Sequence, residues 1–428
     1  MATLHEDITR LVDREHDLLH DPFELWSDLQ ADDAPAVFSE AMGAWLVTRR
    51  DLVLEVLRDT DNWSSRLASS GSDRNNMIAA AMGELVGDPD LVEVMTALAR
   101  DRDGAAVLLA ADPPHHVRQR RAVNRAFRPS RIRSMEPMVS EISTRLLDDF
   151  VADGSVEFVH AYAVLLPMEI IARALGVDSD DLLRFKRWSD DMAIPVGNAA
   201  PTVDEVRRFL VSSHEFNQFF SAKLAERAAD PRDDIISDVA TAEVDGEALT
   251  LTEQRSMCQQ FLVAGNETTT KLLTNLVHRL AIDPALQERV RADRGLVDPL
   301  VEEVLRYEAP VQGLFRNALR DLDFHGITIR EGEPVWCVFS AANRDESHHA
   351  CPHEIRLDRT DEPDHLAFGH GEHFCIGAAL ARLEARIAVN HLLDRCHNIE
   401  LQDGFVPSYE NSYLLRGLRR LDLTFEPA

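Results

Sequence analysis

The chain has 428 residues, of which 45% are hydrophobic and 28% are charged, a composition typical of a globular protein with a large core. Its formal net charge of −29 argues against nucleic acid as a general partner. The five cysteines are odd in number and scattered, with no C-x-x-C pair, which argues against a disulfide scaffold and an intrinsic iron–sulfur cluster.

The hydropathy pattern argues against a membrane or secreted protein. No apolar run approaches the roughly 20 residues that a transmembrane helix needs, and residues 1–7 are polar, with no visible signal peptide. We therefore expect a cytoplasmic protein without a membrane anchor. No repeat, low-complexity tract or Pro/Gly-rich linker divides the sequence, so we expect one large domain over residues 1–428.

Helical periodicity dominates the chain, and short β-like segments lie towards its two ends. The spacing of apolar residues predicts helices over residues 51–58, 134–150, 165–175, 203–228 and 251–281. Strands are expected at residues 44–48, 322–329, 333–339 and 421–425. This pattern indicates a mainly α protein of the α+β class, not an alternating βαβ fold. Residues 64–111 are the least regular, and long loops in compact domains tend to be functional.

Residues 113–134 are basic in an otherwise acidic chain, because they contain no Asp or Glu. Such a patch is a candidate docking surface for an acidic partner, and the alternative is a solvated helix face. Within it, His116 and Arg120 lie one helical turn apart on one face, a spacing suited to binding a single carboxylate. The arginines of this stretch are Arg118, Arg120, Arg121, Arg125, Arg128, Arg131 and Arg133.

The long helix expected over residues 251–281 carries small and polar residues in its middle. Thr250 and Glu253 form a capping-box pattern at its start. The segment Ala264-Gly265-Asn266-Glu267-Thr268-Thr269-Thr270 combines a glycine with three consecutive β-branched residues, each of which lowers helix propensity. We interpret it as a local opening of the helix, where Glu267 supplies a proton source and Thr268 a hydroxyl donor. The alternative is a buried helix that tolerates a glycine.

Residues 368–377 (FGHGEHFCIG) place one cysteine before an apolar helix. Leu380, Leu383 and Ile387 recur at helical spacing, so Cys375 should lie at or just before a helix N-terminus. Unpaired N–H groups and the helix dipole at that place lower a thiol's pKa and favour the thiolate. The glycines let the backbone turn sharply and approach a flat, bulky group. A thiolate presented in this way is a good axial ligand for haem iron.

Two other interpretations of this segment deserve comparison with the haem site. A single cysteine is often a small buried apolar residue. The His-x-x-His-x-Cys spacing of His370, His373 and Cys375 also suggests zinc. Zinc, however, needs a fourth ligand or a water, and it does not require a loop so rich in glycine.

The complete order F-G-x-G-x-H-x-C-x-G at residues 368–377 resembles the haem-binding loop of the cytochrome P450 family. Residues 264–269 resemble the family's oxygen-activating A-G-x-[ED]-T-T segment, and residues 112–120 its D-P-P-x-H-x-x-x-R helix. The resemblance runs from residues 45–49 through residues 341–345 to the end. It is weakest at residues 64–111 and 190–202, where the family has mobile parts of its substrate pocket. It implies the cytochrome P450 fold, a single large helical domain with small β-sheets, and haem b (iron protoporphyrin IX) as cofactor.

The same resemblance implies roles for individual residues. Cys375 would be the axial ligand of the haem iron. Thr268 and Glu267 would be catalytic, delivering protons to bound dioxygen, although many family members have Asp in place of Glu267. Residues expected to bind the haem, the first four through its propionates, are His116, Arg120, Arg316, His373, Ala264, Phe368 and Gly377. An apolar substrate pocket above the haem is expected to be lined by Val263, Ala264, Leu314 and Leu414.

A charged network of structural importance is also implied. Glu303 and Arg306 have the i, i+3 spacing of an ion pair, which is a weak signal alone because exposed pairs contribute under ~1 kcal/mol. In the family a third member, an arginine, follows in a P-x-x-F-D-x-x-R segment. Here Pro352 and Arg359 match that segment, whereas residues 355 and 356 are Ile and Arg in place of Phe and Asp. Glu303, Arg306 and Arg359 are therefore expected to form the network.

The expected function is a haem-thiolate monooxygenase that uses dioxygen and two externally supplied electrons to hydroxylate a small lipophilic substrate. The sequence has no G-x-G-x-x-G or flavin motif, so the resemblance points to a ferredoxin and its reductase as electron donors, docking on residues 118–133. One alternative is a peroxygenase of the same fold. Another is a haem-binding sensor or carrier without turnover, which would not need the Glu267–Thr268 pair.

Overall fold

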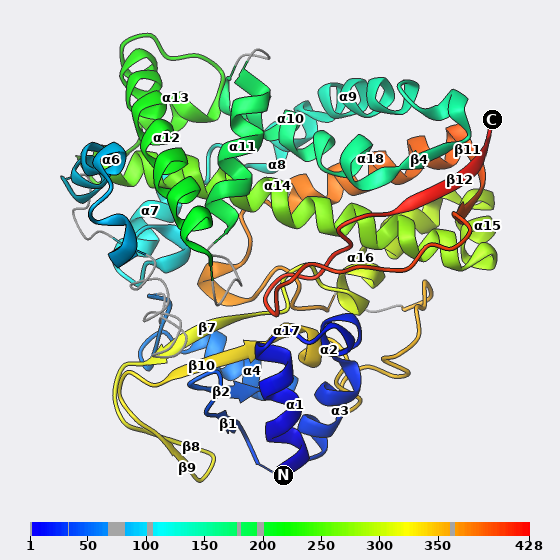
Figure 1. Cartoon of the computed structure of the whole chain (residues 1–428), viewed down its shortest axis with the longest axis horizontal. Coiled ribbons are helices and arrows are strands. Elements are labelled where there is room, and N and C mark those ends of the chain that lie inside the picture. The colour runs from blue at the N-terminus through cyan, green and yellow to red at the C-terminus, as the bar shows by residue number, and fades with distance from the viewer. Residues whose placement is uncertain are drawn as a thin grey trace.

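The computed structural model of the protein describes residues 2–32, 34–66, 82–100, 106–177, 181–194, 201–359 and 364–428. Figure 1 shows a larger part made mostly of helices and a smaller part, around the N-terminus, that holds the largest sheet. Parts of the two stretches where the family resemblance is weakest, residues 64–111 and 190–202, lie outside the described residues.

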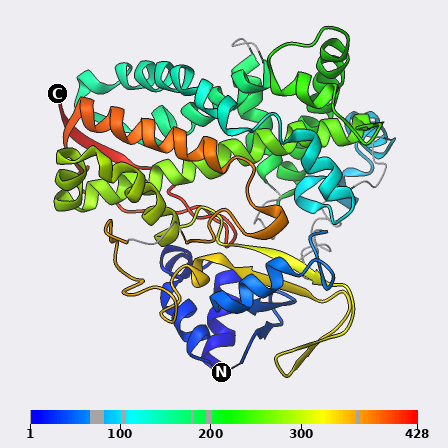
Figure 2. The same cartoon turned by 180° about the vertical axis from the view of Figure 1, so that it is seen from behind.

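Helix α14 (Leu251–Ile282) is the axis of the helical part. It begins at the capping box, in which the Thr250 side chain accepts a hydrogen bond from the Glu253 N–H and the Glu253 carboxylate accepts one from the Thr250 N–H. It buries residues on nearly all sides, as expected of a helix enclosed by others. Figure 2 shows α18 in orange beside α14. The helices that pack most extensively against α14 are α10 (Leu165–Leu175), α11 (Leu182–Ala193), α12 (Val203–Ala229), α16 (Val297–Tyr307) and α18 (Ala378–Arg395).

The other helices cover this group or flank the main sheet. Those of the helical part are α6 (Pro89–Arg100), α7 (His115–Val123), α8 (Pro129–Ser134), α9 (Glu136–Asp148), α13 (Ile235–Ala240) and α15 (Pro284–Ala292). Those near the main sheet are α1 (Ala2–Val12), α2 (His16–His20), α3 (Phe23–Ala31), α4 (Arg50–Arg58) and α17 (Phe339–Ala342).

The main sheet has five strands and is mostly antiparallel. Its only parallel pair in the described chain is β2 with β10, in which Leu46 is opposite Trp336. The strands are, in order, β1 (Val37–Ser39), β2 (Ala44–Val47), β10 (Pro334–Val338), β7 (Gly313–Ala318) and β3 (Trp63–Ser64). A second sheet contains β11 (Cys396–Leu401), β12 (Asp422–Pro427) and β4 (Ser155–Glu157). Two hairpins are formed by β5 (Glu243–Val244) with β6 (Glu247–Ala248), and by β8 (Leu322–Phe324) with β9 (Ile327–Ile329).

Aromatic and cationic side chains join the small sheet-bearing part to the helical part. Within the smaller part, Trp26 of α3 packs edge-on against Trp336 of β10, with ring centroids 5.8 Å apart. The guanidinium carbon of Arg344 lies 3.4 Å from the Phe23 ring centroid and 3.8 Å from that of Tyr307. Because Phe23 belongs to α3 and Tyr307 to α16, this stack fixes the N-terminal helices against the helix that carries the Glu303–Arg306 pair.

The expected mainly α fold with small sheets is confirmed, and the five helices predicted over the ranges above are present with ends within two residues. The single strand expected over residues 322–329 is wrong, because this segment is the β8–β9 hairpin. Its turn residues His325 and Gly326 both have positive φ, 52° and 92°, as a tight hairpin turn requires. The single functional domain over residues 1–428 stays a prediction. None of the helices in the described ranges has the length and apolarity needed to cross a bilayer.

Candidate active site

The loop before α18 presents Cys375 at the start of that helix, three residues before Ala378. The Cys375 N–H donates to the Phe368 carbonyl oxygen at 2.9 Å, which closes the loop. Gly371 has a φ of +71°, and a Cβ at this position would lie 2.8 Å from the Leu57 carbonyl oxygen. Any other residue here would strain the backbone and collide with α4, so the glycine lets the cysteine loop pack against that helix.

The expected lowering of the Cys375 pKa is wrong for the polypeptide alone. Burial raises the pKa of the thiol above its ordinary value, and the N–H groups of Gly377 and Ala378 and the Arg120 guanidinium offset this only in part. Cys375 is accessible to solvent, yet protein atoms surround it densely enough for desolvation to outweigh the helix end. A metal ion bound to the sulfur reverses this balance, because a coordinating thiol is deprotonated.

Two histidines from distant parts of the chain meet beside this loop. The ring centroids of His116 on α7 and His373 in the loop are 4.0 Å apart. Burial lowers the pKa of both, and the positive charges of Arg120 and Arg316 lower it further, so that the pKa of His373 is about 3. Both rings are therefore neutral near pH 7. The His116 Nδ1 and His373 Nε2 atoms are buried and have no hydrogen-bond partner among the described residues.

The same place gathers two arginines. Arg316 on β7 is only 6% exposed, and its Nη1 donates to the Phe315 carbonyl at 2.8 Å. Arg120 on α7 donates through Nη2 to the Phe374 carbonyl at 2.8 Å. Desolvation lowers the pKa of both guanidinium groups, so each gains from an anion placed beside it. Four expected propionate contacts thus converge, and two guanidinium groups beside two buried, unpaired imidazole nitrogens fit the two carboxylates of a haem.

The middle of α14 is arranged differently from the expectation. The helix is continuous through Ala264–Thr270, so the predicted opening of its backbone is wrong. The Thr268 hydroxyl donates back to the Ala264 carbonyl at 2.7 Å, as β-hydroxyl residues in helices do. Gly265 faces α10, where an added Cβ would lie 3.5 Å from Ile171. Ala264 itself is exposed, so room on this face comes from a small side chain and not from a broken helix.

The three residues of the expected network are joined through one carboxylate oxygen. Oε1 of Glu303 accepts hydrogen bonds from Arg306 Nη2 and Arg359 Nε, both at 2.8 Å, and from the Arg356 backbone N–H at 2.9 Å. Arg306 also donates to the carbonyls of Asn343 and Pro352. The network thereby joins α16 to the segment that leads into the cysteine loop. The hydrogen bond from residue 356 comes from its backbone N–H, so it does not depend on the side chain at that position.

The remaining predicted site residues lie on three elements. Val263 belongs to α14, Leu314 to β7 and Leu414 to the C-terminal segment, and all three are partly exposed. The Leu414 carbonyl accepts a hydrogen bond from the Gln312 N–H at 2.8 Å, which places the C-terminal segment beside the start of β7. His115 is exposed, as expected. The contributions of these residues to a substrate pocket stay predictions.

A second charged cluster below the cysteine loop was missed from the sequence. Glu302 accepts hydrogen bonds from Arg382 at 2.6 and 2.8 Å and contacts His365 at 3.0 Å. Although burial alone raises the pKa of Glu302, Arg382 and His365 lower it to about 2. The Arg382 guanidinium also lies 4.6 Å from the Phe368 ring centroid. Arg382 lies one turn into α18, the helix that follows Cys375, and that position was the available signal.

The arginine-rich stretch is less positive in space than in sequence. Arg118 pairs with Glu253 of α14, and Arg131 pairs with Asp238 of α13 at 2.7 Å. Arg121 and Arg125 are exposed, and each has a carboxylate nearby. Arg121 lies 3.2 Å from Asp245, and Arg125 lies 3.5 Å from Asp238. Those left exposed, with no ion pair among the described residues, are Arg128 and Arg133.

Comparisons with known proteins agree with this geometry. A family model for cytochrome P450 matches residues 84–425. The putative cytochrome P450 YjiB of Bacillus subtilis is 34% identical over 88% of this chain and 87% of its own length. The cytochrome P450 monooxygenase PikC of Streptomyces venezuelae is 37% identical over 74% of this chain and 75% of its own. The crystal structure of CYP109E1 from Bacillus megaterium in complex with testosterone is also similar, with 30% identity and a TM-score of 0.79. Its match covers 94% of this chain and 99% of the CYP109E1 chain. The chain therefore belongs to the cytochrome P450 family, as a monooxygenase whose cofactor is haem b.

Proposed function

We propose that this chain hydroxylates a small lipophilic substrate, using dioxygen and two electrons from an external donor, with Cys375 as the axial haem ligand. The observation that carries this proposal is the convergence of His116, Arg120, Arg316 and His373 beside the cysteine loop. The two imidazoles, each with a buried nitrogen that has no hydrogen-bond partner in the described structure, and the two guanidinium groups suit the haem's carboxylates, while Cys375 lies just before α18, where it can bind the iron. Ala264, Phe368 and Gly377 complete the haem site in this proposal.

Haem, when bound, supplies the iron at which dioxygen is activated. The residues of the chain then supply protons and exclude water. We assign proton uptake to Glu267, whose side chain is 21% exposed and therefore reaches solvent. Thr268 already donates its one hydroxyl proton to the Ala264 carbonyl, so its lone pairs are available to accept a hydrogen bond. A proton that arrives from Glu267 can thus be passed on when the hydroxyl turns away from that carbonyl.

We assign electron supply to a small acidic ferredoxin with its reductase. A chain with a net charge of −29 repels an acidic partner at long range, so docking requires a local positive surface. Exposed arginines on α7 and α8 support such a surface, and the unpaired Arg128 and Arg133 are its strongest elements. The cytoplasmic location expected from the sequence stays a prediction.

We assign the substrate to the lipophilic class, because Val263, Leu314 and Leu414 are apolar and partly exposed. The CYP109E1 structure contains testosterone, which makes a steroid a sensible first probe for this chain.

The test is reconstitution of the holoenzyme with ferredoxin, ferredoxin reductase, NADH and dioxygen. Compounds that shift the Soret band towards the high-spin form, testosterone among the first, identify candidate substrates. NADH consumption that matches the amount of hydroxylated product supports the proposal. Efficient peroxide-driven turnover that survives Thr268→Ala would favour a peroxygenase, and tight binding without any product would favour a sensor or carrier.

A further inference from the structure

A buried lysine stands next to the carboxylate that we assign to proton uptake. Lys271 follows Glu267 by one turn of α14, and its side chain is only 3% exposed. Its Nζ donates to Glu267 Oε2 at 2.8 Å and lies 3.6 Å from Glu410 Oε1. The ammonium group therefore has two carboxylates within reach, one on its own helix and one on the C-terminal segment.

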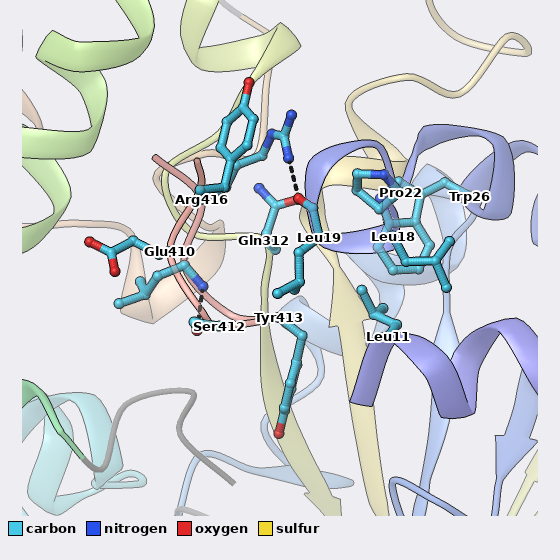
Figure 3. A pocket seen from close by; sticks show the side chains of 12 residues that line it. Leu11, Leu18, Leu19, Pro22, Trp26, Gln312, Glu410, Ser412, Tyr413 and Arg416 are labelled. Atoms are coloured by element: carbon cyan, nitrogen blue, oxygen red, sulfur yellow. Dashed lines mark hydrogen bonds between the residues drawn. The ribbon is translucent and has the colours of Figure 1, made fainter. Parts of the chain in front are cut away.

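The C-terminal segment is packed directly onto this lysine. A Cβ at Gly417 would lie 2.4 Å from Lys271 Cγ, so the glycine is what allows the backbone to approach so closely. The Glu410 N–H donates to the Gly417 carbonyl at 3.0 Å, which holds Glu410 beside the same contact. Figure 3 shows Glu410 on this segment near Ser412 and Arg416, with its carboxylate directed away from Leu11, Leu18 and Trp26.

The charges of this group constrain one another. Burial lowers the pKa of the Lys271 ammonium, but the negative charges of Glu267 and Glu410 more than offset this and raise it above its ordinary value. The lysine is therefore charged throughout the physiological range. A buried ammonium without a counter-ion is strongly unfavourable. If Glu267 were its only partner, every proton that Glu267 took up would leave such an unpaired charge.

We propose that Glu410 is the reserve counter-ion of Lys271, and that it allows Glu267 to take up and release protons. With Glu267 ionised, Lys271 binds it and holds its carboxylate in place. When Glu267 accepts a proton from solvent water, the ammonium moves towards Glu410 and keeps all three of its own protons. When Glu267 gives a proton towards Thr268, Lys271 returns to it. Lys271 and Glu410 are thus positioning residues, and this inference rests on the proposed role of Glu267.

Further charged groups in this region belong to α11 and to the C-terminal segment. Asp190 is close enough for the negative charge of Glu267 to act on it, and it pairs with Lys186, whose Nζ lies 2.6 Å from Asp190 Oδ2. Arg416, on the C-terminal segment, is engaged instead with Glu308 at 3.4 Å and with the carbonyls of residues 19 and 20. Since the Lys186–Asp190 pair is nearly neutral, Lys271 and Glu410 dominate the charge balance at Glu267.

The test follows the protonation of Glu267 by infrared spectroscopy of the substrate-free ferric holoenzyme as a function of pH. The carboxylic-acid C=O band that disappears in Glu267→Gln identifies the residue. In Glu410→Gln the midpoint of this band should move about one unit to lower pH, a tenfold change, because protonation then leaves Lys271 unpaired. In Lys271→Met it should move to higher pH. Glu426→Gln, which removes an exposed carboxylate from β12, should leave the midpoint unchanged.

An unchanged midpoint in Glu410→Gln would overturn the inference. Because Glu410 is partly exposed, this variant is expected to fold even if Lys271→Met does not. The infrared measurement needs no turnover, so the inference and the proposed function fail separately. If the midpoints shift as expected but Glu267→Gln keeps full, tightly coupled turnover, the paired carboxylates are real and the assignment of proton uptake to Glu267 is wrong. In turnover, Glu410→Gln should show a larger solvent isotope effect with unchanged substrate binding.

Discussion

The imidazole of His116 lies against that of His373, with ring centroids 4.0 Å apart, although one belongs to α7 and the other to the loop before α18. Each ring has a buried nitrogen without a hydrogen-bond partner in the described structure. Leaving a buried polar atom unpaired costs about 1–3 kcal/mol, so a ligand that supplies the partner stabilises this arrangement. The proposed partner is the haem.

Replacing His116 with alanine is expected to loosen the haem. A hydrogen bond to a charged group contributes about 1.5–3 kcal/mol, so haem transfer from the ferric enzyme to apomyoglobin should accelerate about tenfold or more. His115→Ala is the matched control, because His115 directly precedes His116 on α7 and its side chain is exposed. The haem transfer rate of this variant should equal that of the wild type. Equal rates for the two variants would contradict the assignment of His116 to a propionate.

Replacing Glu302 with glutamine is expected to destabilise the fold in a pH-dependent way. Arg382 and His365 hold the pKa of Glu302 at about 2, below its ordinary value, so its stabilisation is present above about pH 4.5 and is lost as the pH falls towards 2. Glu302→Gln should lower the free energy of unfolding at pH 7 by up to about 3 kcal/mol. Guanidinium unfolding at pH 7 and pH 4 should show the deficit shrinking at the lower pH, whereas Glu331→Gln, at an exposed site, should show none.

Glu384 on α18 is expected to behave in the opposite way. Burial raises the pKa of this carboxyl well above its ordinary value, and its Oε2 has no hydrogen-bond partner in the described structure. Its contribution to stability is complete below about pH 4.5, where the unfolded carboxyl is also protonated, and falls as the pH rises towards the folded pKa. Glu384→Gln should therefore be more stable than the wild type at pH 7, by an amount that grows by up to about 1.4 kcal/mol per pH unit above 4.5. A constant difference in thermal midpoint between pH 5 and pH 8 would contradict this.

Charge reversal at Arg128 or Arg133 is expected to weaken ferredoxin-driven turnover without changing substrate binding. Both are exposed and free of ion pairs in the described structure, so each should act on an acidic partner directly. The KM for ferredoxin should rise several-fold and depend less steeply on salt, while the substrate-induced Soret shift is unchanged. Arg419→Glu, at an exposed site on the C-terminal segment, is the control. If all three variants show the same kinetics, docking does not involve α8.

Much of the fold and of the candidate site followed from local patterns. The capping box at Thr250 predicted the start of α14 correctly, because both of its hydrogen bonds are made within one turn. The sharp turns expected from the glycines of the cysteine loop are present, since Gly369 and Gly371 have φ of 70° and 71°, whereas the approach of this loop to a flat group stays a prediction. Family spacing brought His116, Arg120, Arg316 and His373 to one place, where simple periodicity would have left them as separate surface residues.

The errors concern quantities that depend on the whole environment. The sign of the Cys375 pKa shift depends on desolvation by surrounding protein, which outweighs the helix end that the sequence revealed. The arginine-rich stretch lost much of its charge to Glu253, Asp238 and Asp245, all of them more than 100 residues further along the chain. The contact of Lys271 with Glu410 was invisible for the same reason, since no periodicity relates α14 to the C-terminal segment.

The most direct test of the central claim is the ferrous–carbon monoxide spectrum of Cys375→Ser compared with Cys351→Ser. Cys351 is also a free, exposed cysteine, so its replacement controls for the loss of any accessible thiol. The account predicts that the wild type and Cys351→Ser give the red-shifted Soret band of a thiolate-ligated haem. Cys375→Ser should lack this band, whether or not the variant still binds haem. A thiolate-type band that persists in Cys375→Ser would contradict the assignment of Cys375 as the axial ligand.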